Sequence, residues 1–279
     1  MEMIREIRKS PFHALPVEHR PGTPILETRG LSIRFENRLA LDNITFQLNT
    51  SERVAVVGPN GAGKSTLFKV IAGVLPYTEG EVNIYGSGPG GHICIAYLPQ
   101  RNQVDWEFPV NVIDVVMMGR IGKLGLLHWP GRKDWEYAQQ CLEDVGMGDL
   151  AKRQIGELSG GQQQRMFIAR ALAQEAEIML MDEPLTGLDI SSQEKIFEIL
   201  DELQHRGVTV MIATHDLDQA AGRFDHVMLL NHQLMGLGKS EEVFTPDNLR
   251  KAYGGHLKQV QAGNGLYLVA DTCCDEGER

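Results

Sequence analysis

The chain has 279 residues, of which 42% are hydrophobic and 23% are charged, a balance typical of a soluble globular protein. Its length predicts one or two domains with enough apolar residues for a sizeable core. A formal net charge of −10 argues against nucleic-acid binding, which needs a basic surface, and no apolar run approaches the roughly 18 residues of a membrane span.

The first half of the chain is predicted to form short strands around one helix. Residues 1–24 contain four prolines, no hydrophobic period and no apolar centre of a secretory signal, so we expect an extension outside the folded domain. A helix is expected over 67–72, after a glycine-rich turn. Segments rich in β-branched and alternating apolar residues predict strands over 25–35, 44–48, 53–57, 82–85 and 93–98.

The second half begins with a change of pattern. Between residues 100 and 158, helical spacing replaces the strand pattern and predicts a helical insertion, with helices over 111–118 and 133–145. Strands then alternate with helices, which predicts a largely parallel α/β sheet. The helices are expected over 161–173, 191–206 and 217–224, and the strands over 178–181 and 209–213.

The glycine-rich turn after the strand at 53–57 matches the phosphate-binding P-loop, G-x-x-x-x-G-K-[ST]. Its glycines let backbone N–H groups converge on phosphate oxygens, and the following helix directs its positive end at the same anion. Lys64 is expected to reach the β- and γ-phosphates of ATP, and Ser65 to ligate Mg²⁺. The segment consists of Gly58, Pro59, Asn60, Gly61, Ala62, Gly63, Lys64, Ser65 and Thr66.

Two acids follow the apolar strand at 178–181. Asp182 is placed to hold Mg²⁺ at the phosphates, and Glu183 is placed to orient and deprotonate the attacking water. A solvated acidic turn after a core strand would contain the same residues, but a P-loop in the same chain favours the catalytic interpretation.

A second glycine-rich helix start lies far along the chain from the P-loop, where Ser159, Gly160, Gly161 and Gln162 follow Leu158. Its backbone N–H groups and the Ser159 hydroxyl predict a second phosphate-binding helix N-terminus, the alternative being an ordinary helix cap. One chain has no obvious need for two phosphate cradles. Two copies arranged head to tail would use both, because one cradle would close over the ATP held by the other.

These motifs, in this order, resemble the ATP-binding subunits of ABC transporters over residues 25–238. The resemblance implies an α/β fold with a P-loop ATPase core, a mainly parallel sheet and an antiparallel β part. It also implies a helical subdomain inserted at about 101–175. Residues 239–279 then form a C-terminal extension to which no role is assigned.

Four further residues take roles only through this resemblance. Phe35 would stack on adenine, and Gln100 would sense Mg²⁺ and the partner subunit. Asp189 would cross the dimer, and His215 would contact the γ-phosphate. Taken singly, the four could instead be a packed strand residue, a surface turn residue, a helix N-cap and a histidine at a strand end.

The resemblance also implies cofactors, partners and location. A homodimer would bind ATP and Mg²⁺ and hydrolyse ATP to ADP and phosphate. Integral membrane permease subunits would hold it at the cytoplasmic face of the membrane, and an extracytoplasmic metal-binding protein would be an indirect partner through the permease. Nucleic acid would not be a partner.

The indication of the cargo lies just after Gln100. Residues 102–110 and 115–120 resemble the version of this segment found in importers of manganese, zinc or iron, with iron-chelate or cobalamin importers as the nearest alternative. A DNA-repair or chromosome ATPase would insert long coiled coils here, whereas this insertion is short and has no sustained heptads. A translation-factor ATPase would normally carry two ATPase units in one chain.

Trp106 and Phe108 lie in the same segment and are expected to line a groove that receives a short cytoplasmic helix of the permease. Two large apolar rings beside acidic residues suit an interface with an apolar centre and a charged rim. The alternative is that both rings belong to the core of the helical insertion, in which case their truncation would destabilise the fold.

The four cysteines fit a reducing compartment. Cys94 and Cys141 are isolated among apolar residues and are expected to be small core residues. The adjacent Cys273 and Cys274 lie in an acidic tail, where exposed thiols or a metal site are the two interpretations.

Overall fold

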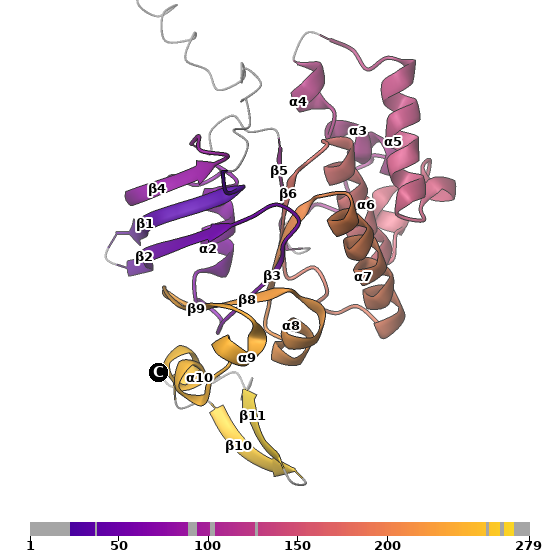
Figure 1. The fold of residues 1–279 in the computed structure, drawn as a ribbon. Helices are drawn as coiled ribbons and strands as arrows, with labels where there is room; N and C mark the ends of the chain where they lie inside the picture. The colour runs from indigo at the N-terminus through magenta and orange to yellow at the C-terminus, as the bar shows by residue number, and fades with distance from the viewer. Residues whose placement is uncertain are drawn as a thin grey trace, which may run out of the picture.

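The computed structural model describes residues 23–36, 38–88, 94–100, 104–125, 128–254, 257–262 and 265–270. Two larger β-sheets, a group of helices and a C-terminal segment with a two-stranded sheet make up this part of the chain (Figure 1). The expected extension at 1–24 and the pair Cys273 and Cys274 fall mostly or wholly outside the described residues. None of the described helices is long and apolar enough to cross a membrane.

The central sheet has six strands in the order β5-β6-β7-β3-β8-β9. Four neighbouring pairs are parallel, and only β8 and β9 pair antiparallel. The strands are β5 (Ile95–Leu98), β6 (Ile178–Asp182), β7 (Thr209–Thr214), β3 (Arg53–Val57), β8 (His226–Asn231) and β9 (Gln233–Gly238).

Strand β6 shows why this sheet is buried on both sides. Every residue of β6 is buried, as expected of a parallel strand covered on two faces. Because successive side chains alternate, Met179 and Met181 pack toward the helical insertion, while Ile178 and Leu180 pack toward the second sheet.

The second sheet is antiparallel, in the order β2-β1-β4. Its strands are β1 (Leu26–Phe35), β2 (Arg38–Leu48) and β4 (Glu79–Ile84). Alternate side chains of these strands pack with helix α2 (Lys64–Ile71) and one face of the central sheet in a single hydrophobic cluster. Cys94 is buried in this cluster, as expected.

The helical insertion covers the opposite face of the central sheet (Figure 1). Cys141 is buried there, as expected. The insertion contains α3 (Val112–Met118), α4 (Ile121–Leu124), α5 (Arg132–Asp144), the 3-10 turns η3 (Gly148–Leu150) and η4 (Ile155–Glu157), and α6 (Gly160–Ala173).

The two rings expected to line a permease groove have different environments. Trp106 is half-buried against the core of the insertion, with its ring edge-on to Phe167 at a centroid distance of 5.7 Å. Phe108 is 55% exposed. The core alternative therefore describes Trp106, whereas Phe108 is a surface residue.

The chain after α6 completes the central sheet and its edge. Helix α7 (Ile190–His205) precedes β7, and α8 (Leu217–Arg223) precedes β8. Beyond Gly238, α9 (Ser240–Val243) and α10 (Pro246–Tyr253) pack on β8 and β9 through Val243 and Leu249. The antiparallel hairpin of β10 (Leu257–Ala262) and β11 (Gly265–Ala270) follows.

Several element bounds differ from the sequence-based expectation, and strands β8 and β9 were not predicted. Strand β2 begins at Arg38 rather than at 44, because its first residues pair with the end of β1 across a tight turn. Helix α2 begins at Lys64 rather than at 67, inside the P-loop motif. Local apolar patterns did not show either start, since both depend on neighbouring backbone.

Candidate nucleotide-binding site

The P-loop segment connects the end of β3 to the start of α2. Gly63 is the N-cap of α2, with φ of +98°, and no side chain caps the helix. A Cβ atom at Gly63 would lie 2.7 Å from the Ala40 carbonyl oxygen, and one at Gly58 would lie 2.0 Å from the Leu230 carbonyl oxygen. Glycine is therefore required at both positions, and the helix N-terminus is left open to an anion.

Lys64 is buried at the start of α2, with 6% of its surface exposed. Its Nζ donates hydrogen bonds to the carbonyl oxygens of Gly58 (2.7 Å) and Pro59 (3.1 Å), which hold the ammonium group inside the loop. Burial lowers the pKa of Lys64, while the nearby charges of Glu183 and Asp182 oppose this shift.

Asp182 ends β6 beside this lysine and is 2% exposed. Within the described part of the chain, neither oxygen of its carboxylate accepts a well-formed hydrogen bond. Burial raises the pKa of Asp182, and the nearby Ser65 hydroxyl opposes the rise. A buried carboxylate without a partner is costly, so this oxygen pair beside the Ser65 hydroxyl fits a divalent cation such as Mg²⁺.

A cavity of about 240 Å³ opens over the N-terminus of α2. Gln100, two residues after the end of β5, and Glu183, directly after β6, contribute to its wall. The backbone of Glu183 has φ of +51°, and its N–H donates to the Ala213 carbonyl oxygen at 3.0 Å. The cavity is lined by Ala40, Asn60, Gly61, Ala62, Gly63, Lys64, Ser65, Thr66, Gln100 and Glu183.

Several expected site residues do not line this cavity, among them Phe35 and His215. Phe35 ends β1 with 48% of its surface exposed, so it is not the packed strand residue that was the alternative. His215 follows β7 and is exposed. Both side chains are available to a ligand that extends beyond the cavity.

The second glycine-rich segment caps its own helix. The Ser159 hydroxyl accepts a hydrogen bond from the Gln162 N–H at 3.4 Å, and the Gln162 side chain accepts one from the Ser159 N–H at 2.9 Å. Gly160 is the first residue of α6. A Cβ atom at Gly161 would lie 2.6 Å from the Ser192 hydroxyl, so this glycine lets α6 approach α7 closely.

Asp189 is the N-cap of α7. Its carboxylate accepts hydrogen bonds from the Ser192 N–H (2.9 Å) and from the hydroxyls of Ser191 (2.6 Å) and Ser192 (2.8 Å). The hydroxyl bonds are the main reason that the pKa of Asp189 is lowered. In the single chain Asp189 therefore serves its own helix, as the alternative predicted, and its exposed position leaves a second role open.

Two residues near the site had no role in the sequence-based prediction. Ala40 lines the cavity from β2, and its carbonyl oxygen lies against Gly63. Tyr97, on β5, has a buried hydroxyl near Asp182, and burial raises its pKa to about 12. Ala40 contributes through the position of its backbone, which its residue type does not indicate. Tyr97 lies three residues before Gln100, so the sequence could have indicated that it lies near the site.

A P-loop, a buried acid at the end of β6 and a cavity over the start of α2 define a nucleotide-binding domain of the P-loop class. Residues 41–186 match the ABC transporter family. The chain therefore belongs to the ABC transporter family, as an ATP-binding subunit.

Curated relatives agree with this assignment over most of their length. The chain is 45% identical to the manganese transport system ATP-binding protein MntB of Bacillus subtilis, covering 83% of this chain and 93% of that protein. It is 42% identical to the zinc transport system ATP-binding protein TroB of Treponema pallidum, covering 82% and 87%. It is 41% identical to the chelated iron transport system membrane protein YfeB of Yersinia pestis, covering 88% and 84%.

Solved structures show the same fold. A putative metal-chelate type ABC transporter in an inward-facing conformation has a chain with a TM-score of 0.74 and 30% identity, covering 88% of this chain and 96% of that one. An ATP-binding cassette of an ABC transporter in its ADP conformation has a TM-score of 0.73 and 28% identity, covering 84% and 99%.

Proposed function

We propose that the chain is the ATP-hydrolysing subunit of a metal-ion importer. The observation that supports hydrolysis best is the unpartnered buried carboxylate of Asp182, close to Lys64 and beside a cavity lined by Glu183. Hydrolysis of a nucleoside triphosphate needs a cation at the β- and γ-phosphates, a metal ligand and a water-orienting group in one place.

Each residue around the cavity has a separate role in ATP hydrolysis. Lys64 neutralises charge on the β- and γ-phosphates, which the open N-terminus of α2 also attracts. Asp182 and Ser65 would hold Mg²⁺, and the ion, when bound, supplies positive charge at the phosphate oxygens. Glu183 orients the attacking water and accepts its proton, with Gln100 on the wall of the same cavity.

The remaining expected residues act at the edge of the nucleotide and across a dimer. Phe35 stacks on adenine with its exposed ring, and His215 contacts the γ-phosphate. The α6 segment from Ser159 to Gln162 is surface-accessible at Ser159, and it closes over the ATP of a second copy arranged head to tail. Asp189 is exposed and reaches the same interface.

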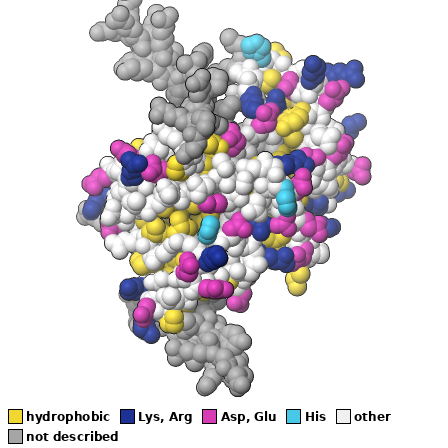
Figure 2. Space-filling model, viewed as in Figure 1, with side chains coloured by type: hydrophobic (Ala, Val, Ile, Leu, Met, Phe, Trp, Pro, Cys, Tyr) yellow, Lys and Arg dark blue, Asp and Glu magenta, His cyan; other side chains and the backbone are white. Residues whose placement is uncertain are grey.

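The dimer works at the cytoplasmic face of the membrane, held there by permease subunits. The relatives named for manganese, zinc and chelated iron transport support a metal ion as cargo, with manganese or zinc before iron. An extracytoplasmic metal-binding protein reaches this subunit only through the permease. Acidic and basic side chains are interspersed on the face shown in Figure 2, which does not favour nucleic acid as a partner.

An iron chelate is the second candidate cargo. Two comparisons favour it, the relative named for chelated iron transport and the metal-chelate type transporter of the same fold. The ATPase does not touch the cargo, so its own site is the same under both proposals. The cargo must therefore be determined in cells.

The test is elemental analysis of cells grown with limiting metal. A strain lacking the gene is complemented either with the wild-type chain or with Lys64→Ala, which is the matched control because it removes ATP use. We expect the deletion and the Lys64→Ala strain to accumulate less manganese or zinc, and the wild-type chain to restore accumulation. Unchanged levels of manganese, zinc and iron, with loss of siderophore or cobalamin uptake, would contradict metal-ion import.

A further inference from the structure

Two segments that carry expected site residues leave the same edge of the central sheet. Strands β6 and β7 are parallel neighbours, and the carboxyl ends of parallel strands lie at one edge. Residues 183–189 follow β6 and lead to α7, and residues 215–216 follow β7 and lead to α8. The first segment contains Glu183 and Asp189, and the second contains His215. Their common action depends on how the two segments are held relative to each other.

Gln193, near the start of α7, is bound to the 183–189 segment through its backbone and its side chain. Its N–H donates to the Asp189 carbonyl oxygen at 3.0 Å, which is the first hydrogen bond of the helix. Its side-chain Nε2 donates to the carbonyl oxygens of Leu188 (3.0 Å) and Leu185 (3.4 Å). One residue therefore binds three carbonyl groups of this segment.

The other atom of the Gln193 amide group reaches α8. Its Oε1 accepts a hydrogen bond from the Nε2 of Gln219 at 3.2 Å. The backbone N–H of Gln219 donates to the Oδ1 of Asp216 at 2.8 Å, because Asp216 is the N-cap of α8. Asp216 directly follows His215 in the chain. A continuous series of hydrogen bonds therefore joins the 183–189 segment to the neighbour of His215.

A neutral amide that both donates and accepts is what this position needs. Gln193 and Gln219 are half-buried, so their hydrogen bonds are partly shielded from water. A carboxylate at residue 193 would place negative charge against the carbonyl oxygens of Leu185 and Leu188, and an aliphatic side chain would leave these oxygens without this donor.

Helices α7 and α8 are also held together without the glutamine pair. Phe197 of α7 packs edge-on against Phe224, directly after α8, at a centroid distance of 6.1 Å. Arg223 of α8 pairs with Glu194 of α7 and lies over the Phe197 ring at 5.0 Å. Loss of the amide contacts should therefore leave α8 packed on α7 and release only the segments at the edge of the sheet.

We propose that Gln193 is a positioning residue for ATP hydrolysis. By joining the 183–189 segment to Gln219, it holds Asp189 and His215 in the relative arrangement that the shared site requires. Gln193 does not line the nucleotide cavity, so it acts through these segments. The inference rests on the proposed function, because Asp189 and His215 have their roles only there. It adds that one side chain sets the contact with the second chain and the contact with the γ-phosphate together.

The experiment measures kcat and KM for ATP by phosphate release from the full chain. Gln193→Leu is compared with Gln204→Leu, a matched control on the same helix. Gln204 is also half-buried, and its Nε2 donates to the Ser51 carbonyl oxygen at 3.0 Å, in the turn between β2 and β3. We expect Gln193→Leu to lower kcat about 10–100-fold with KM unchanged, and Gln204→Leu to leave both at wild-type values.

Two further measurements separate positioning from general stability. In the Ser159→Arg background, where no shared site forms, Gln193→Leu should leave the ATP affinity of the single chain unchanged. The exchange of Gln193→Lys together with Gln219→Glu should restore much of kcat, because an ammonium group can donate both to the carbonyl oxygens and to the new carboxylate. Gln219→Leu breaks the same contact from α8 and replaces Gln193→Leu if the latter does not fold.

The outcomes separate this inference from the proposed function. A wild-type kcat in Gln193→Leu or Gln219→Leu, or an equal fall in Gln204→Leu, overturns the positioning role. A fall in single-chain ATP affinity also overturns it, because the effect would then lie in nucleotide binding. An exchange that restores the thermal midpoint but not kcat shows that the contact only stabilises the fold. A wild-type chain that hydrolyses no ATP contradicts the proposed function itself.

Discussion

The N-termini of α2 and α6 both follow glycine-rich segments, but they are satisfied in different ways. No side chain caps α2, and its loop instead holds the ammonium group of Lys64 on two carbonyl oxygens. The N-terminus of α6 is closed by reciprocal hydrogen bonds between Ser159 and Gln162. One helix start is left open to an anion, whereas the other is already capped within the single chain.

The difference indicates a division of labour between the two segments. The α2 site has the ammonium group, the buried acid and the cavity within one chain, so the proposed function lets it bind a nucleotide without a partner. Among the described residues, no comparable acid and cavity accompany the start of α6, so under the proposed function its contribution to ATP would require a second chain and an exchange of hydrogen bonds at Ser159. Substitutions at the two sites should therefore separate binding from hydrolysis.

The largest effect is expected from Lys64→Ala. This change removes the charge at the β- and γ-phosphates, which no neutral residue replaces, so ATP binding should weaken and hydrolysis should nearly disappear while the fold survives. The measurements are phosphate release, nucleotide titration and circular dichroism, with Lys195→Ala on the exposed part of α7 as control. A near-normal rate of hydrolysis in Lys64→Ala would show that the P-loop assignment is wrong.

Glu183→Gln should separate the chemistry from binding. Loss of a general base typically lowers the rate about 10²–10⁴-fold. Because Lys64 and Asp182 remain, the variant should keep ATP and Mg²⁺ and accumulate as an ATP-bound dimer in size-exclusion chromatography. A variant that stays monomeric at saturating ATP counts against the shared site.

The helical insertion supplies the next comparison, between Trp106 and Phe108. Trp106→Ala removes a ring that packs on Phe167 and should lower the free energy of unfolding by about 3–5 kcal/mol. Phe108→Ala removes an exposed ring and should change it by about 0.5 kcal/mol or less. Denaturant unfolding of both variants is the measurement, and equal losses would contradict the described packing.

Asp182→Asn is expected to raise the free energy of unfolding, an effect smaller than that of Trp106→Ala and opposite in sign. The folded-state pKa of Asp182 is raised, so its contribution to stability is present at low pH and is lost as pH rises through that pKa. Without metal, the variant should be more stable than the wild type at pH 7, by about 0.5–2 kcal/mol. The advantage should disappear at about pH 3–4, near the ordinary pKa of an aspartate.

The same variant should lose stabilisation by Mg²⁺ and ATP. Thermal unfolding with and without the two ligands, over a pH series, measures both effects. An Asp182→Asn chain that is less stable than the wild type at neutral pH without metal would show that the carboxylate is satisfied in the folded protein.

Much of the fold and the central part of the site could be predicted because local patterns carry them. The strand at 53–57, the P-loop and the two acids at the end of β6 follow one another in the chain, and the structure brings Lys64, Gln100 and Glu183 to one cavity. The alternation of helices and strands likewise predicted the parallel sheet.

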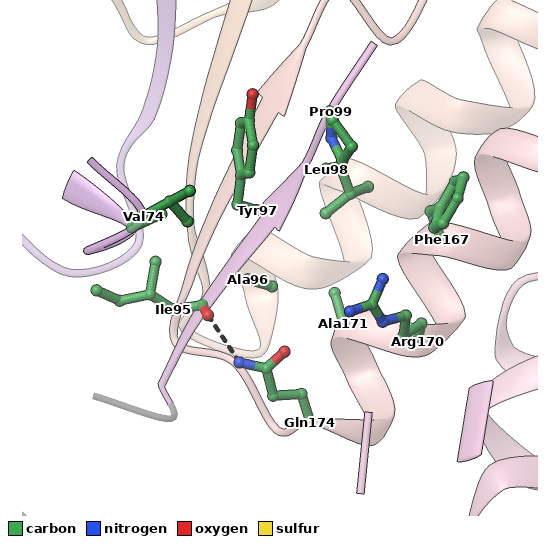
Figure 3. Close-up of a pocket in the computed structure, with 11 residues that line it drawn as sticks. Val74, Ile95, Ala96, Tyr97, Leu98, Pro99, Phe167, Arg170, Ala171 and Gln174 are labelled. Carbon is green, nitrogen blue, oxygen red and sulfur yellow. Dashed lines mark hydrogen bonds between the residues drawn. The ribbon is translucent and has the colours of Figure 1, made fainter. Parts of the chain in front are cut away.

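The rest depended on contacts between distant segments. Ala40 lines the cavity only because β2 passes beside the P-loop, and the sequence of β2 contains no sign of this. The helical spacing of α6 does not show that Arg170 lines a cavity together with β5, since that depends on how the two elements pack (Figure 3). Trp106 and Phe108 are similar in composition but differ in burial, which only the packing of the insertion determines.

A pair of variants tests the sharing of sites between two chains. Ser159→Arg and Lys64→Ala each leave a homodimer without an intact site. When the two are mixed, one site of each mixed dimer combines a normal Lys64 with a normal Ser159. Hydrolysis should therefore rise on mixing, and an unchanged sum of the two separate rates would argue against a shared site.

The most direct measurement is the ATP affinity of monomeric Ser159→Arg, determined by calorimetry beside its rate of hydrolysis. If α2 binds ATP within one chain and α6 completes the site of the other, the affinity of the monomer will equal that of the wild type while hydrolysis is lost. A fall in monomer affinity that accompanies the loss of hydrolysis would place the α6 segment on its own nucleotide and contradict the division between the two helix N-termini.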